Sequence, residues 1–280
     1  MTRFLTLRTQ DVAGSVQPAR VVDCNPSITP YAYSLVPDAQ VARDVAGSDV
    51  VLAIHGFNVS RPHGVGSLAK LDEYLALPPN YLFFGVLWPG DFWLPVVDYP
   101  WEAAHAVTTG RYIADYANRV FQSATSISFI SHSLGGRVLL EAVQRLDRPA
   151  VQLCITAGAV DRDCMDAQYL GARENAGRIS VLSSTADKVL RLAYPAGDFI
   201  SDVLLGDNDN PWQIALGLKG PRQPVLPPLV GKAIPGDLGY DHGDYFPPSE
   251  PPKTPPPDPK WSHSAAYMRR AVTGQPNLWS

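Results

Sequence analysis

Short apolar runs rich in β-branched residues alternate along the chain with longer stretches in which apolar residues recur at helical spacing. The short runs predict buried strands, and the longer stretches predict amphipathic helices between them. The predicted strands are 49–54, 81–87, 126–130, 151–155 and 178–182, and the predicted helices are 67–77, 101–123 and 136–146. Alternation of this kind indicates an α/β fold with a doubly wound, mostly parallel sheet flanked by helices.

The ends of the chain extend this pattern into one predicted domain of residues 1–280. Further elements are predicted as strands at 4–7, around 31–41 and around 232–237, and as a terminal helix at 262–272. Residues 246–260 are rich in proline and poor in apolar side chains, so we interpret them as a surface insertion.

Composition narrows the class of protein. Hydrophobic residues make up 45% of the chain, enough for a sizeable core, and the formal net charge is −4. Without a basic surplus, binding to nucleic acid is not expected. No apolar run reaches the ~20 residues of a membrane span, and the first run ends too soon for a secretory leader. The three cysteines cannot all pair, so the sequence predicts a reducing, cytoplasmic location.

The strongest chemical signal is the segment Ser131-His132-Ser133-Leu134-Gly135, between a predicted strand and a predicted helix. A serine on such a turn has a strained backbone, which requires small residues two positions before and after it. Ser131 and Gly135 meet that requirement. The hydroxyl of Ser133 would stand at a helix N-terminus, where the N–H of Leu134 could stabilise an oxyanion. The alternative is an ordinary serine-rich turn.

With these residues the chain resembles the α/β-hydrolases, in a branch of bacterial esterase- and lipase-like proteins of which many are described only as hydrolases of unknown function. The resemblance implies a serine nucleophile, the chain order Ser–acid–His and a reaction without a cofactor. It spans roughly residues 50–246, and the segments that carry it are 55–58, 88–90 with Tyr99, 131–135, 183–187 and 241–245.

In this fold a second oxyanion donor comes from the loop after an earlier strand, here His55-Gly56-Phe57-Asn58. The N–H of Phe57 is the favoured donor, ahead of that of Asn58. For His55 we expect a role in bridging loops by hydrogen bonds.

Two acids and two histidines follow Ser133 at suitable places. Asp187, after the strand at 178–182, is favoured over Asp161, and either could instead cap a helix. His242 lies in a glycine-bounded loop and is favoured over His263, which begins the terminal helix. His132 is interpreted as a packing or hydrogen-bonding neighbour, and His63 and His105 as surface residues.

The apolar loop after the strand at 81–87 suggests a pocket. Trp88, Phe92 and Trp93 are predicted to form a wall or lid above the sheet, and core packing is the alternative for them.

These residues predict a serine hydrolase that cleaves a small-molecule carboxylic ester, or a related acyl substrate, through an acyl-enzyme. The oligomeric state is left open. One alternative is a non-catalytic binding protein that keeps the fold with an impaired triad. A less favoured alternative is a metal site built from Asp241, His242, Asp244 and His263, because their spacing matches no closed zinc pattern.

Overall fold

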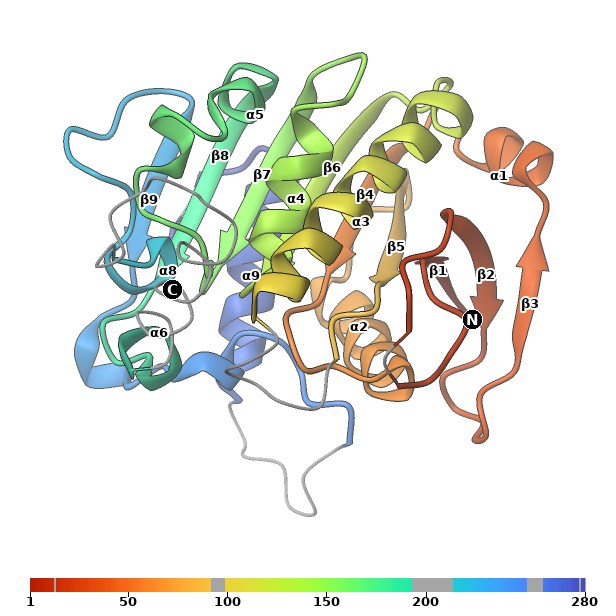
Figure 1. Ribbon diagram of the computed structural model, residues 1–280, viewed down its shortest axis with the longest axis horizontal. Helices are drawn as coiled ribbons and strands as arrows, with labels where there is room; N and C mark the ends of the chain where they lie inside the picture. Colours follow the sequence, from red (N-terminus) through yellow and green to blue (C-terminus); the bar gives the residue numbers. More distant parts are fainter. Residues whose placement is uncertain (13, 92–98, 193–213, 251–258, 277, 280) are drawn as a thin grey trace.

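The structure is a computed structural model that describes residues 1–12, 14–91, 99–192, 214–250, 259–276 and 278–279 (Figure 1). In this part of the chain, nine strands form one sheet in the order β3-β2-β1-β5-β4-β6-β7-β8-β9. The pairs β1–β2 and β2–β3 are antiparallel and all other neighbours are parallel. The strands are β1 (Thr2–Thr6), β2 (Arg20–Cys24), β3 (Tyr33–Val36), β4 (Asp49–Ile54), β5 (Tyr81–Leu87), β6 (Ser126–His132), β7 (Ala150–Thr156), β8 (Ala176–Ser183) and β9 (Leu229–Ala233).

Helices cover both faces of the sheet. The α-helices are α1 (Asp38–Asp44), α2 (Arg61–Leu75), α3 (Tyr99–Val120), α4 (Gly135–Val143), α5 (Leu170–Glu174), α6 (Lys188–Leu192), α8 (Leu216–Lys219) and α9 (Lys260–Val272), and the short 3₁₀ helices are η1 (Cys164–Asp166), η2 (Gly236–Leu238) and η3 (His242–Asp244). Helices α3 and α4 pack on one face, in front of the sheet in Figure 1, and α2 and α9 pack on the other. The predicted doubly wound, mostly parallel sheet is confirmed.

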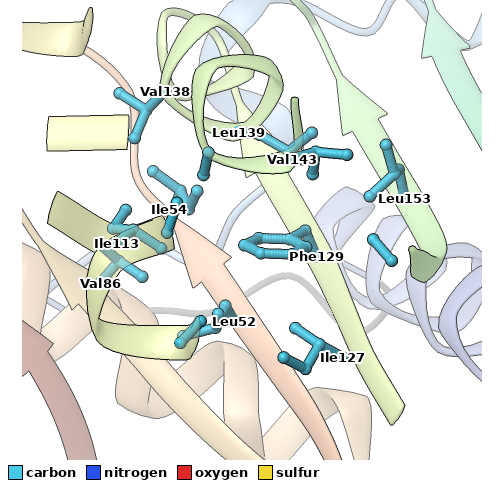
Figure 2. Packing of buried hydrophobic residues seen from close by; sticks show 14 of the residues in the cluster. Leu52, Ile54, Val86, Ile113, Ile127, Phe129, Val138, Leu139, Val143 and Leu153 are labelled. Atoms are coloured by element: carbon cyan, nitrogen blue, oxygen red, sulfur yellow. The ribbon is translucent and has the colours of Figure 1, made fainter. Parts of the chain in front are cut away.

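The central strands are apolar on both sides because both faces are covered. Leu52 and Ile54 of β4 point to the core beneath α3 and α4, whereas Val51 and Ala53 belong to the core beneath α2 and α9. Figure 2 shows the first of these cores, where side chains of β4 to β7 meet Ile113 of α3 and others of α4. A continuous apolar run was therefore the correct signal for these strands.

Several boundaries differ from the sequence predictions. Helix α2 begins at Arg61, six residues before the predicted start, because Ser60 caps it by accepting a hydrogen bond from the N–H of His63. The strand predicted around 31–41 is only β3, since Pro37 ends it and α1 follows. Strand β2 was not predicted. The strand predicted around 232–237 lies earlier, as β9.

The parallel strands place their following loops at one edge of the sheet, which is where α/β folds build sites. The loops after β4, β5, β6, β8 and β9 all begin there. Among the helices that the structure describes, none is long and apolar enough to cross a membrane. Residues 251–258 of the proline-rich segment lie outside the described residues.

Candidate active site

Ser133 sits on a sharp turn between β6 and α4. Its backbone φ is +56°, in the left-handed region that non-glycine residues rarely adopt. The turn is held because the N–H of Ser133 donates to the carbonyl of Thr156, while its own carbonyl accepts from Gly136 and Ala159. The side chain is 6% exposed. The sequence therefore folds locally into the strained strand–turn–helix geometry of a nucleophile elbow.

Two glycines let the elbow approach the loop after β4. A Cβ on Gly135 would lie 2.6 Å from the carbonyl oxygen of His55 and 2.8 Å from that of Ile54. A Cβ on Gly56 would lie 2.8 Å from the Cβ of Ser133. All three distances are too short for any side chain, so the two loops can meet this closely only through glycine.

The structure brings Ser133, His242 and Asp187 together in one hydrogen-bond chain. Nε2 of His242 lies 2.8 Å from Oγ of Ser133, and Nδ1 lies 2.8 Å from Oδ2 of Asp187. Because the carboxylate only accepts, Nδ1 carries the proton and Nε2 is left to accept from the serine hydroxyl. This is the arrangement that a general base needs toward a serine nucleophile.

Asp187 and His242 are each fixed by their own loop. Asp187 is fully buried, and its second oxygen accepts from the N–H of Leu190 at the start of α6 at 2.9 Å. Around η3, Asp241 accepts from the N–H of His242, and Asp244 accepts from that of Asp241, which forms a capping box. The pKa of Asp241 is lowered by hydrogen bonds, first of all from the backbone of Lys188.

Asp241 and Asp244, the two carboxylates considered for a metal site, thus hold the loop of His242. Asp244 also accepts from Nζ of Lys260 at 2.8 Å, which ties η3 to α9. In the described part of the chain, no group of three or more histidine, cysteine, aspartate or glutamate residues could hold a metal ion. His263 lies in the first turn of α9 and Asp161 forms a short antiparallel bridge to Ala215.

The loop after β4 faces the elbow with one peptide unit already oriented. Nδ1 of His55 donates to the carbonyl of Gly56 at 2.8 Å, and its Nε2 accepts from the N–H of Trp88. A trans peptide points its C=O and N–H in opposite directions, so this bond also orients the N–H of Phe57. The N–H of Asn58 is occupied, because it donates to the carbonyl of Gly90 at 2.6 Å.

The N–H groups of Phe57 and Leu134 donate no hydrogen bond within the described residues. That leaves both available to a ligand, as an oxyanion hole requires. Burial lowers the pKa of His55 to about 4, so this imidazole is neutral and keeps its role as a fixed donor at neutral pH.

A buried arginine, which the sequence analysis did not single out, joins three loops at this edge. The guanidinium of Arg8 lies 2.7 Å from the carboxylate of Asp91 and donates to the backbone carbonyls of Val59 and Trp88. It also donates to the carbonyls of Gln10 and Asp11. An unpaired buried charge is very costly, so these partners fix Arg8 and the loops together. Its sequence signal was weak, since Arg8 looks like an ordinary charge after a short strand.

Of the three predicted pocket residues, the structure describes Trp88, and its indole does not line a pocket. Trp88 is fully buried: it stacks on His55 with ring centroids 5.8 Å apart, and its Nε1 donates to the carbonyl of His55. Its part is therefore to support the loop after β4, because its indole is enclosed by the core. Phe92 and Trp93 lie outside the described residues. His63 is exposed as expected, whereas His105 is half-buried and burial lowers its pKa.

A cavity of about 220 Å³ does open beside the site. It lies between the loop after β4, the start of α2 and the segment after η3. The segment is held against α2 because Oγ of Ser67 donates to the carbonyl of Pro247, and Nζ of Lys70 donates to those of Pro248 and Ser249. The lining combines imidazole rings, backbone, and small polar and apolar side chains, which suits a small uncharged group.

Residues 38–200, more than half of the chain, match a protein family described as "Alpha/beta hydrolase of unknown function (DUF900)". The chain belongs to this family. The matched span contains Ser133 and Asp187, and His242 follows it. No curated protein matches the chain.

Solved structures similar to the chain include one plant protein and two esterases. SOBER1 of Arabidopsis thaliana has 13% identity and a TM-score of 0.49, with 81% of this chain and 99% of that chain covered. Esterase PE8 has 14% identity and a TM-score of 0.44, with 81% and 94% covered. An inhibited esterase B of Lactobacillus rhamnosis has 13% identity and a TM-score of 0.37, with 70% and 69% covered.

Proposed function

We propose that the protein is a serine hydrolase that cleaves a carboxylic ester through an acyl-enzyme. The observation that carries the proposal is the chain of two 2.8 Å hydrogen bonds from Ser133 through His242 to Asp187. Membership of an α/β-hydrolase family makes hydrolysis the expected class of reaction.

In the proposed reaction, Oγ of Ser133 attacks the substrate carbonyl carbon and its proton passes to Nε2 of His242. The carbonyl oxygen becomes an oxyanion that accepts from the N–H groups of Phe57 and Leu134. When the tetrahedral intermediate collapses, the carbon–oxygen bond to the alcohol breaks and the alcohol takes the proton from His242. Water then attacks the acyl-enzyme by the same route and releases the acid. Asp187 keeps the ring of His242 oriented and stabilises its protonated form.

The proposed substrate is a small uncharged ester, with one of its ends in the 220 Å³ cavity. This volume lies below the ~300–1,000 Å³ of sites for drug-sized ligands, so a short chain is favoured. We propose a reducing, cytoplasmic setting, which is consistent with the three buried free thiols of Cys24, Cys154 and Cys164.

A fluorophosphonate probe tests the serine chemistry. The proposal expects stoichiometric labelling of Ser133 by mass spectrometry, with loss of fluoride and formation of one oxygen–phosphorus bond, and none in Ser133→Ala. Intact wild-type protein that is neither labelled nor active on p-nitrophenyl esters would overturn the proposal.

A panel of matched substrates then defines the bond cleaved. p-Nitrophenyl butyrate, the corresponding thioester and the corresponding anilide share one acyl group. We expect the ester to be cleaved fastest. Anilide cleavage as fast as ester cleavage would instead assign the protein to the amidases.

A further inference from the structure

His132, the residue before Ser133, is bonded to the backbone of the residue that carries the base. Its Nε2 lies 2.7 Å from the carbonyl oxygen of His242. A carbonyl only accepts, so Nε2 must carry the hydrogen. We propose that His132 is a positioning residue that holds His242 in line with Ser133 through this hydrogen bond. The inference rests on the proposed function.

The bond closes a short loop of contacts around the reacting atoms. His132 and Ser133 are neighbours in the chain, and both side chains reach His242, one at its carbonyl and the other at its ring nitrogen. The backbone and the ring of His242 are thus both held by hydrogen bonds to residues at the end of β6. Any movement of η3 away from the elbow has to break the bond from His132 as well.

The ring of His132 is itself held by its surroundings. Its centroid lies 4.8 Å from that of His242, 6.0 Å from that of Tyr245 and 5.3 Å from that of Phe246. Gly56 leaves room for its Nδ1, since a Cβ there would lie 3.0 Å from that atom. A ring enclosed in this way presents its Nε2–H in one direction and loses little entropy on bonding.

The electrostatic setting keeps His132 in the form that the bond needs. Burial lowers its pKa to about 3, and repulsion from the positive charge that His242 can carry acts in the same direction. His132 therefore stays neutral when His242 takes the proton of Ser133. It remains a donor throughout turnover and does not compete as a base.

Three substitutions at this position separate the effect of side-chain length from that of the hydrogen-bond donor. In His132→Gln, the amide nitrogen lies about as far from the backbone as Nε2 does, so it can donate to the same carbonyl. His132→Asn carries the same amide one bond shorter, and His132→Phe keeps a ring without a donor. A base displaced by ~1 Å loses up to ~100-fold in rate. We expect kcat on p-nitrophenyl acetate to fall about 10- to 100-fold in the Asn and Phe variants, and less than about 5-fold in the Gln variant.

Two further readouts distinguish positioning from other roles. KM should change by less than about 3-fold, and the acid limb of the pH–kcat profile should stay at its wild-type position in all three variants. A residue that relayed protons would instead remove an ionisation from that profile. In the ¹⁵N spectrum of the full-length protein, His132 should show the neutral Nε2–H form from pH 5 to 9, and the Nδ1–H form would overturn the proposal.

The outcomes separate this inference from the function on which it rests. Failure of the wild-type protein to react with fluorophosphonate contradicts the proposed function. If the wild-type protein reacts but the Asn and Gln variants are equally active, the role of His132 is contradicted and the proposed function is not. Should the Phe variant not fold in a thermal melt, the Gln and Asn pair still decides the question.

Discussion

Replacing Asp187 with asparagine tests the part of the site that sets the protonation of His242. Oδ1 of Asp187 accepts from the N–H of Leu190, so the amide oxygen of the new side chain will keep that place. Its NH₂ group must then occupy the place of Oδ2, 2.8 Å from Nδ1 of His242. Two donors cannot face each other, and His242 must move its proton to Nε2.

A proton on Nε2 disables the base, because Nε2 then donates toward Oγ of Ser133 and cannot accept its hydrogen. In serine proteases the same exchange lowers kcat by about 10⁴, which corresponds to about 5.4 kcal/mol at 1.36 kcal/mol per tenfold change. We expect a loss of this size in kcat for p-nitrophenyl acetate at pH 7.5. The melting temperature should change little, since asparagine has the size of aspartate.

Asp161→Asn is the matched control, because Asp161 was the other candidate acid in the sequence. Its substitution should leave kcat within about 3-fold of the wild-type value. The reasoning would be refuted if Asp187→Asn kept a tenth or more of the wild-type kcat, or if Asp161→Asn lost as much as Asp187→Asn.

The sequence predicted the central strands well because burial on both faces makes each one a continuous apolar run. The bounds predicted for β4 and β5 agree with the structure. Helix α2 was predicted too short, since its first turns hold Gly64 and Gly66 in place of apolar residues. Those glycines reflect tertiary contacts: a Cβ on Gly66 would lie 2.9 Å from the carbonyl of Ser249, far along the chain. No local pattern contains that information.

The site could be predicted only in part for the same reason. Ser133 could be identified from the sequence around it, because backbone strain at one residue requires small residues nearby in the chain. The choice between His242 and His263 depended on how a distant loop closes, which the Asp241–Asp244 capping box and Lys260 determine. The contacts of Trp88 and Arg8 are equally non-local. Arg8 looks unremarkable in the sequence and Trp88 was predicted to line a pocket, whereas the structure shows both joining loops around the candidate site.

Three further predictions concern the cavity, the elbow and acid stability. Gly243 lines the cavity, and a Cβ there would meet nothing within 4 Å, so a larger side chain should fill the cavity. Gly243→Leu should therefore lower the ratio of kcat/KM for p-nitrophenyl hexanoate to that for the acetate about tenfold, and Gly243→Ala should give a ratio between those of Gly243→Leu and the wild type. An unchanged ratio would exclude the cavity as the site that binds the chain. Gly135→Ala should lower the free energy of unfolding by about 1–3 kcal/mol in urea, because its Cβ would meet backbone, whereas Gly171→Ala, with no contact under 3.5 Å, should not destabilise the fold. Burial lowers the pKa of His55 to about 4 and that of His132 to about 3, while in the unfolded chain both are near 6.5. Between these values the unfolded chain binds more protons than the folded one, so the free energy of unfolding falls as the pH drops below 6.5. At pH 5 the loss is about 2 kcal/mol for each histidine. Urea unfolding at pH 7 and pH 5 measures it, and His132→Phe should remove about half of the difference that these two histidines cause. The exposed His63 is the control, and His63→Gln should leave the difference in free energy of unfolding between pH 7 and pH 5 unchanged. A His132→Phe variant with the full wild-type difference would show that His132 is already charged in the folded protein at pH 5.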